Sequence, residues 1–441
     1  MSPNATAVGI LAVTAGLRII CASALGPLAD EAWYRLWSER PALGYYDQPP
    51  GIAVAVGLGA WLQDDALGWR LPGLLAASFA PLALLRHTPN PVAWALWCAT
   101  LPSFGVLGTL ATPDVGLLAL IPLALRFWLD GRALAFGAAV GAATLFRHDA
   151  ALLGALALIG QPAAFGLRAA LAAATVSAPH IVWLLRHDAI TLHFQASQAL
   201  WRGSADPLGP LMAAAGQWLA VTPVAASAGA AAIVGSRDPL ARWVVGFALL
   251  HGIAAVGAPP ELHWPTWGWL PVGLLLSRTD GRLTRARDVG LALAGAAQLA
   301  LWTHLAVRPL VSLADDPRGR FRVGEALADV AAPWLLPEGA ERRSTEAADI
   351  PAVLTERYQE AALLAHHLGV PVVVAPECGR RGQHDLWADP VPPCTWFIRP
   401  QRSGPIRCVS ADGPRQIVGR GVGTGEVLGV WDLASTCGRS P

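Results

Sequence analysis

In this chain of 441 residues, 54% are hydrophobic and only 14% are charged, and the mean hydropathy is +0.43; these values are typical of a polytopic membrane protein and argue against a soluble domain. The formal net charge is +1 and there is no basic run, which argues against a nucleic-acid partner. The 32 residues counted as Lys or Arg are all Arg, which we attribute to genome composition.

The first apolar run, residues 8–28, is long enough to cross a bilayer. It is too long for the core of a signal peptide and has no clear Ala-x-Ala cleavage site, so we expect a retained helix. A polar loop with two adjacent carboxylates, Asp30 and Glu31, follows directly. Carboxylates are costly to keep beside lipid, which favours a functional site there. The structural alternative is that Asp30 caps a helix and Glu31 lies in its first turn.

Further apolar runs follow along the chain. Because about twenty residues cross the hydrocarbon core and shorter buried helices are tolerated, we expect about eleven transmembrane helices. The run at 51–63 is either a membrane-surface helix or another crossing. The remaining expected spans are 67–85, 91–109, 114–129, 133–146, 150–161, 168–185, 209–234, 243–257, 265–277 and 289–307.

The positions of Arg residues predict an orientation. With a cytoplasmic N-terminus, the cytoplasmic turns hold more Arg than the external ones, as the positive-inside rule requires. The strongest indication is the Arg-rich turn at 277–288, and an odd number of helices then places residues 308–441 outside a cytoplasmic (inner) membrane. The cytoplasmic turns contain Arg86, Arg132, Arg168, Arg237, Arg242, Arg278, Arg282, Arg285 and Arg287, and the external ones Arg35, Arg40, Arg147, Arg186 and Arg202.

The same layout places the polar clusters on one side of the membrane. Carboxylates, His and Arg gathered at the outer surface are what an active site there needs, although ordinary solvated loops are the alternative for any single cluster. The clusters are the 29–50 loop, Thr112-Pro113-Asp114, Arg147-His148-Asp149, Arg186-His187-Asp188 with His193 and Gln195, and Glu261-Leu262-His263-Trp264.

Two motifs in the first loop carry a resemblance to a known family. Asp30-Glu31-Ala32-Trp33-Tyr34, followed by Gly44-Tyr45-Tyr46-Asp47-Gln48-Pro49-Pro50, resembles the first external loop of the family 39/83 glycosyltransferases. These are bacterial relatives of protein O-mannosyltransferases and of the lipid A aminoarabinose transferase, and they have a GT-C fold. Weaker similarities follow in the same order at Gly68–Pro72, Thr112–Asp114, Pro179–Trp183, Phe194-Gln195, Tyr358–Ala362 and Gln383–Trp387.

The chain also departs from this family. Gln48 stands where His is usual, Arg147-His148-Asp149 stands where Ser-Lys-Tyr is common, and Trp183-Leu184 replaces a Trp-Asn pair. These departures leave the sugar and the phosphate-binding residues open.

The resemblance implies transfer of a sugar from a polyprenyl phosphate to an acceptor hydroxyl of a lipid, glycan or protein, with inversion. Such a reaction needs a carboxylate to accept the hydroxyl proton and cations to hold the phosphate leaving group. Asp30 is the candidate base, with Glu31 and Asp114 as supporting or metal-site carboxylates if a divalent ion is used. Arg147 is the first candidate for the phosphate, followed by Arg186 and His187. The remaining predicted substrate-binding residues are Tyr45, Tyr46, Asp47, Pro49, Pro50 and His148.

Several structural interpretations compete with these roles. Arg147 and Arg186 are alternatively anchors at helix ends, and His187 and His193 solvated loop residues. Trp33, Trp37, Tyr45 and Tyr46 form either an aromatic belt or a platform for a sugar, and the sequence does not decide between them.

The C-terminal part of the chain has a different character. We divide the chain into a transmembrane module, 1–307, whose first external loop is 29–66, and an outer domain, 308–441. A helix-like segment at 356–367 and a strand-like one at 370–374 predict a small mixed α/β domain. In an oxidising compartment, Cys378, Cys394, Cys408 and Cys437 permit one or two disulfides, whereas Cys21 and Cys98 are expected to be buried small residues.

Two other functions remain open. A transporter or flippase of lipid-linked sugars predicts carboxylates in the middle of helices, whereas here they gather at helix ends. The other alternative is a catalytically silent scaffold. No phosphate-binding glycine loop with Lys-Ser/Thr is present, which argues against a nucleotide-driven transporter.

Overall fold

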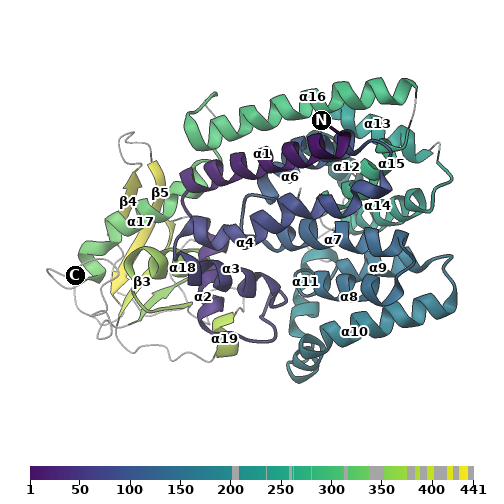
Figure 1. The fold of residues 1–441 in the computed structure, drawn as a ribbon. Helices are drawn as coiled ribbons and strands as arrows, with labels where there is room; N and C mark the ends of the chain where they lie inside the picture. The colour runs from purple at the N-terminus through teal and green to yellow at the C-terminus, as the bar shows by residue number, and fades with distance from the viewer. Residues whose placement is uncertain are drawn as a thin grey trace. The chain divides into compact units, whose positions relative to one another are not determined.

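The computed structural model divides the chain into two compact units (Figure 1). It describes residues 1–200, 208–234, 236–257, 261, 263–279, 281–311, 316–336, 352–374, 383–387, 395–401, 415–420 and 427–435. The first unit comprises Met1–Ala24 and Pro41–Leu310, and the second comprises Leu25–Arg40 and Val311–Pro441. The segment 25–40, which the sequence analysis places in the transmembrane module, therefore groups with the C-terminal residues.

The first unit is helical, and each expected apolar run coincides mostly with one or two helices, although the first run ends earlier than expected, at Ala24. Its elements are α1 (Pro3–Ala24), α3 (Gly51–Leu62), α4 (Ala66–Phe79), η1 (Ala80–His87), α5 (Pro91–Thr100), α6 (Pro102–Leu107), α7 (Pro113–Leu129), α8 (Ala133–Thr144), α9 (Ala150–Leu158), α10 (Ala163–Arg186), α11 (Ile190–Leu200), α12 (Gly209–Val221), α13 (Pro223–Val234), α14 (Pro239–Gly257), η2 (Thr266–Gly268), α15 (Trp269–Ser277), α16 (Arg282–Trp302) and η3 (Thr303–Val307).

Not every apolar run is long enough to span a membrane by itself. Among the described residues, five helices are long and apolar enough: Pro3–Ala24, Ala66–His87, Ala163–Arg186, Pro239–Val256 and Arg282–Val307. A sixth span results if α12 and α13, bent by 111° where Pro223 begins the second helix, count as one. Pro102 divides the run at 91–109 in the same way, because the residue before a proline avoids the helical region and Leu101 is extended. The count of about eleven is therefore not confirmed.

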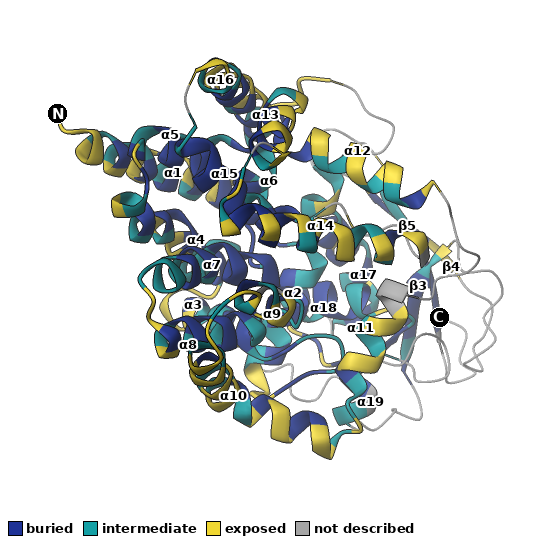
Figure 2. Ribbon diagram, turned by 90° about the vertical axis from the view of Figure 1, so that its right-hand side faces the viewer, coloured by how far each residue is buried: buried dark blue, intermediate teal, exposed yellow. Residues whose placement is uncertain are grey.

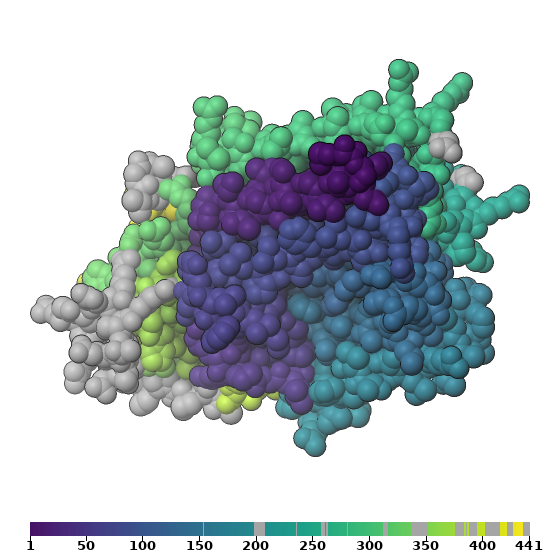
Figure 3. Space-filling view, in the orientation of Figure 1, coloured from purple at the N-terminus to yellow at the C-terminus, as the bar shows by residue number. Residues whose placement is uncertain are grey.

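The surface and the interior of the first unit are both apolar. Trp94, Trp97, Ile121 and Leu274 lie in one buried cluster. On the outside, α10 and α14 carry long exposed stretches (Figure 2), and α1 forms a purple band on the surface (Figure 3) that exposes Val8, Val13 and Ile20. Exposed apolar surface of this extent is typical of a protein that faces lipid.

The second unit is the expected mixed α/β domain. Its elements are α2 (Ala29–Glu39), α17 (Gly319–Leu335), β1 (Val353–Thr355), α18 (Tyr358–Leu368), β2 (Val372–Val374), α19 (Gln383–Trp387), β3 (Trp396–Pro400), β4 (Arg415–Arg420) and β5 (Val427–Ser435). The strands form one sheet in the order β2-β1-β3-β5-β4, parallel on both sides of β1 and antiparallel from β3 onward. Leu327, Leu364, Ile398 and Trp431 form its core. The fold-class prediction is therefore confirmed, including the helix and the strand expected near 356–374.

The prediction of a loop at 29–50 is wrong in its first half. Residues 29–39 form α2, which begins at Leu28 as its N-cap. The structural alternative was closer, but the capping residue differs. Glu31, not Asp30, accepts the backbone N–H of Leu28, at 2.9 Å. The four C-terminal cysteines and the polar run 338–346 lie outside the described residues, whereas Cys21 and Cys98 are free and buried, as expected.

Candidate active site

Asp30 is held by a residue from the far end of the chain. In the second unit the hydroxyl of Tyr358, at the start of α18, donates a hydrogen bond of 2.7 Å to Oδ1 of Asp30 in the first turn of α2. The two residues are 328 positions apart. The neutral hydroxyl of Tyr358 positions this carboxylate. Because Asp30 is only half-buried, a substrate can still reach it. Tyr358 was not among the predicted site residues, although the weak motif at 358–362 begins with it.

Aromatic side chains surround this hydrogen bond. The ring of Trp33, three residues after Asp30, lies 5.4 Å from Tyr358, 5.3 Å from His384 and 6.0 Å from Trp387, measured between ring centroids. The motifs at 30–34, 358–362 and 383–387, which the sequence places far apart, thus meet within one unit. Trp33 and Trp37 are buried, so neither ring forms an exposed belt or an open platform for a sugar.

Glu31 has a structural contact of its own. Its side chain is fully buried and closes the first turn of α2 by accepting the N–H of Leu28. A carboxylate used in this way stabilises a helix N-terminus. Its predicted catalytic role therefore stays a prediction.

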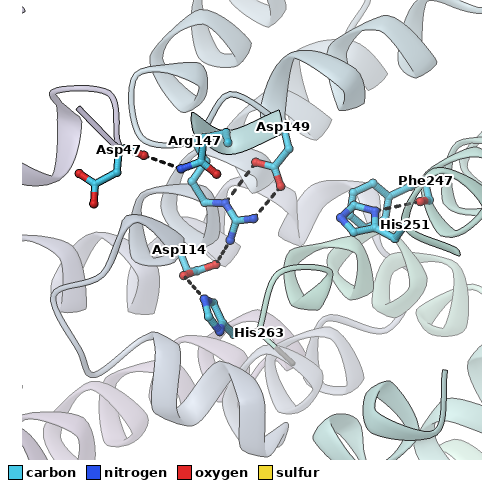
Figure 4. A network of polar contacts seen from close by, with 8 residues as sticks. Asp47, Asp114, Arg147, Asp149, Phe247, His251 and His263 are labelled. Carbon is cyan, nitrogen blue, oxygen red and sulfur yellow. Dashed lines mark hydrogen bonds and ion pairs between the residues drawn. The ribbon is translucent and has the colours of Figure 1, made fainter. Parts of the chain in front are cut away.

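Arg147 forms the centre of an ion-pair network in the first unit (Figure 4). Its guanidinium donates to Oδ1 of Asp114 at the start of α7 and, through Nη2 and Nε at 2.8 and 3.2 Å, to both carboxylate oxygens of Asp149. His263 lies on the other side of Asp114, with its Nε2 3.7 Å from Oδ2. The predicted clusters at 112–114, 147–149 and 261–264 are therefore brought together.

This network leaves Arg147 occupied. Its side chain is 13% exposed, that of Asp114 is 4% exposed, and one positive charge faces two negative ones. A donor phosphate would have to replace a carboxylate at the guanidinium, so Arg147 is not a preformed open anion site.

The second motif of the first loop is bound to α11. The Oγ1–H of Thr191 donates to the carbonyl of Tyr45 at 2.6 Å, and the Nε2 amide of Gln195 donates to the carbonyl of Asp47. Tyr46 packs on Phe194 with ring centroids 5.5 Å apart. Pro50 is the N-cap of α3. The motifs at 44–50 and 194–195 thus form one structure, and Tyr45 is buried in it.

Two histidines beside this loop share a hydrogen bond. His180 Nδ1–H donates to the carbonyl of Leu43 at 2.8 Å, so its Nε2 accepts, and His148 donates from Nε2 at 2.9 Å. Burial, and then the nearby His180, lower the pKa of His148 to about 4. His148 is therefore neutral at physiological pH. The hydrogen bond between the two rings depends on this, because two protonated histidines would repel each other.

Arg186 and His187 do not join the Arg147 network. Arg186 is exposed at the end of α10, whereas His187 is stacked on Trp183, with ring centroids 4.1 Å apart, and donates from Nδ1 to the carbonyl of Trp183. His193 is also exposed. Among the described residues, no three His, Cys, Asp or Glu side chains gather in a way that would hold a metal ion.

Comparison with solved structures identifies the class of fold. The crystal structure of ArnT from Cupriavidus metallidurans in the apo state has a TM-score of 0.61 with this chain at 14% identity, covering 98% of each chain. The same protein bound to undecaprenyl phosphate gives 0.63 at 13% identity, covering 98% of this chain and 99% of that one. The chain thus has the GT-C fold, as the resemblance of its first loop predicted.

One curated relative adds a more particular likeness. The chain is 33% identical over 195 residues to lipid A galacturonosyltransferase RgtD of Rhizobium johnstonii. The match covers 39% of this chain and 41% of that enzyme. No family model matches the chain.

Proposed function

We propose that this protein is an integral-membrane glycosyltransferase that moves a sugar from a polyprenyl-phosphate donor to an acceptor hydroxyl, with Asp30 as the general base. The observation that carries the proposal is the hydrogen bond by which Tyr358 positions the half-buried carboxylate of Asp30. The GT-C fold and the resemblance of the 30–34 motif support it.

The reaction is a single displacement with inversion. The acceptor oxygen attacks the anomeric carbon as Asp30 accepts its proton, and the bond from the anomeric carbon to the phosphate oxygen breaks. The electron pair leaves with the polyprenyl phosphate. Tyr358 contributes by holding Oδ1 of Asp30 in place, which orients the carboxylate for accepting the proton.

The relatives suggest both substrates. One neighbouring structure holds undecaprenyl phosphate, and the curated relative is named for transfer to lipid A, so we propose an undecaprenyl-phosphate sugar and a lipid A-type acceptor. We further propose that Arg147 binds the donor phosphate by exchanging one of its carboxylate partners. Following the Arg distribution, the reaction and the C-terminal domain are placed on the outer face of the inner membrane.

The test compares two carboxylates on the same helix. Asp30→Asn keeps the shape of the side chain but removes the proton acceptor, so transfer should fall by about 10²-fold or more. Glu39→Gln is the control, because Glu39 is exposed at the end of α2 and pairs with Arg35 at 3.0 Å, a surface contact worth little. Each variant is expressed in a strain that lacks the protein, and lipid A is examined by mass spectrometry for the sugar adduct.

The possible outcomes separate the alternatives. Loss of the adduct in Asp30→Asn with a normal Glu39→Gln supports the enzyme. Normal transfer by folded Asp30→Asn removes the assignment of the base. No difference in lipid A between cells with and without the wild-type protein would instead favour a transporter or a scaffold.

A further inference from the structure

The close packing of α8 against α10 brings two helix N-termini to the same end of the first unit. A Cβ on Gly137 would lie 2.0 Å from the carbonyl oxygen of Ala169, and one on Gly141 2.7 Å from that of Ala173. Four residues further along α8 therefore correspond to four residues further along α10, so the two helices run parallel, side by side in Figures 1 and 2. Glycines four residues apart permit such close backbone contact between helices in membranes.

A cavity of about 540 Å³ opens where these two helices begin. The first turn of α8 and the first turn of α10 line it, together with Arg132 and Arg168, which are both exposed. Neither helix has a side chain that caps its N-terminus, so first-turn N–H groups of both remain available as donors. Each helix start carries roughly half a positive charge, which adds to the two arginines.

Within the described part of the chain, this positive charge has no counterpart. Neither Arg132 nor Arg168 forms an ion pair there; Arg132 lies over the ring of Phe127, 5.3 Å from its centroid. The neighbouring acid, Asp130, pairs with Arg86 and Arg126, and Nε2 of His87 lies 2.9 Å from its Oδ1. The cavity therefore has the charge and the donors to bind an anion.

The surroundings of the cavity indicate what kind of anion it binds. Leu134 lines the cavity and is 60% exposed, and Leu167 and Leu171 on α10 are 63% and 58% exposed. α10 is one of the helices long enough to span the membrane, and the cavity is at its N-terminal end. Cationic groups at the end of a span with exposed leucines beside them match a phospholipid, whose headgroup is anionic and whose chains are apolar. Free phosphate would leave the leucines without a role.

We propose that this cavity binds the headgroup of an anionic phospholipid, with Arg132 and Arg168 on the phosphate and the acyl chains along Leu134, Leu167 and Leu171. The Arg distribution places this end on the cytoplasmic side, where basic pockets between helices bind anionic lipids. The site is separate from the residues proposed for sugar transfer and does not depend on that proposal.

The test measures lipid binding to the purified full-length protein by native mass spectrometry in detergent. Phosphatidylglycerol and phosphatidylcholine with identical acyl chains are titrated separately, and inorganic phosphate is added as a competitor. The wild type should bind phosphatidylglycerol at least about ten-fold more tightly than phosphatidylcholine. Arg132→Gln/Arg168→Gln should reduce phosphatidylglycerol binding on the order of 10- to 30-fold, because each Arg near an anionic headgroup contributes a few-fold or more.

Arg282→Gln/Arg285→Gln is the matched control. It removes the same charge from two exposed arginines at the start of α16, which is predicted to lie on the same side of the membrane. It should bind phosphatidylglycerol as the wild type does, and Arg132→Lys/Arg168→Lys should retain most of the binding. Equal wild-type affinity for the two lipids, an equal loss in the control, or full competition by millimolar phosphate would each overturn the proposal.

Discussion

Removal of the Arg147 charge provides the sharpest test of the network around Asp114. The guanidinium contributes one positive charge against two carboxylates, so the three groups carry a net charge of −1. Asp114 is buried, and the side chain of Arg147 is 13% exposed. In Arg147→Gln the net charge of this group becomes −2. Asp114, whose side chain is 4% exposed, then loses its cationic partner. Breaking a buried pair from one side costs about 3–5 kcal/mol. We therefore expect this variant to melt several degrees below the wild type.

A charge-matched variant separates stability from function. Arg147→Gln/Asp149→Asn returns the net charge to −1, and Asp149→Asn alone leaves Arg147 paired with Asp114. Both should melt closer to the wild type than Arg147→Gln does. Thermal unfolding of the purified proteins in one detergent measures this. If the double variant is as unstable as Arg147→Gln, the charge balance is not what stabilises this region.

The same variants test the phosphate role. At equal amounts of folded protein, the KM for the polyprenyl-phosphate donor should rise about 10²-fold in the double variant, on the order of two charge-assisted hydrogen bonds, and Arg147→Lys should recover part of it. An unchanged donor KM in the double variant would refute phosphate binding by Arg147 and make Arg186 the next candidate.

Three further predictions follow from other parts of the structure. Tyr358→Phe removes the donor to Asp30, so kcat should fall about ten-fold with little change in donor KM, whereas Tyr34→Phe should not have this effect. Because the pKa of His148 is lowered to about 4, the first unit should become less stable as pH falls from 6.5 to 4. Because burial raises the pKa of Glu360 to about 7, the second unit should become less stable as pH rises from 4.5 to 7. In thermal unfolding, His148→Gln should flatten the first trend and Glu360→Gln the second, and unchanged curves would contradict the assignment. In a chain without its six native cysteines, single Cys residues placed at the exposed positions 41 and 43 and at 338–346 should react with a membrane-impermeant reagent added outside, and those at 280–286 should not; the reverse pattern would overturn the orientation.

The sequence by itself determined the class of the protein and most of its helices. A long apolar run predicts a helix strongly, because all of its residues must be buried in lipid or in a helical core. The runs expected here are mostly helical. The apolar runs do not indicate whether a helix continues through a proline. Pro102 and Pro223 divide two of them, and this decides between a full crossing and two short helices. The periodicity of Trp33 and Trp37 in α2 was a helical signal, but the polar residues around it favoured a loop.

Only the tertiary structure decided which polar groups are partners. The motifs at 30–34 and 44–50 were recognisable as chemically unusual, yet nothing local indicated that Tyr358 donates to Asp30 or that Arg147 pairs with Asp114 and Asp149. The pattern of apolar and polar residues along a chain reflects the periodicity of a helix or strand and the exposure of each residue to solvent, which are local properties. A hydrogen bond between residues 328 positions apart depends on how helices and a sheet pack, because its geometry exists only after α2 and α18 have come together.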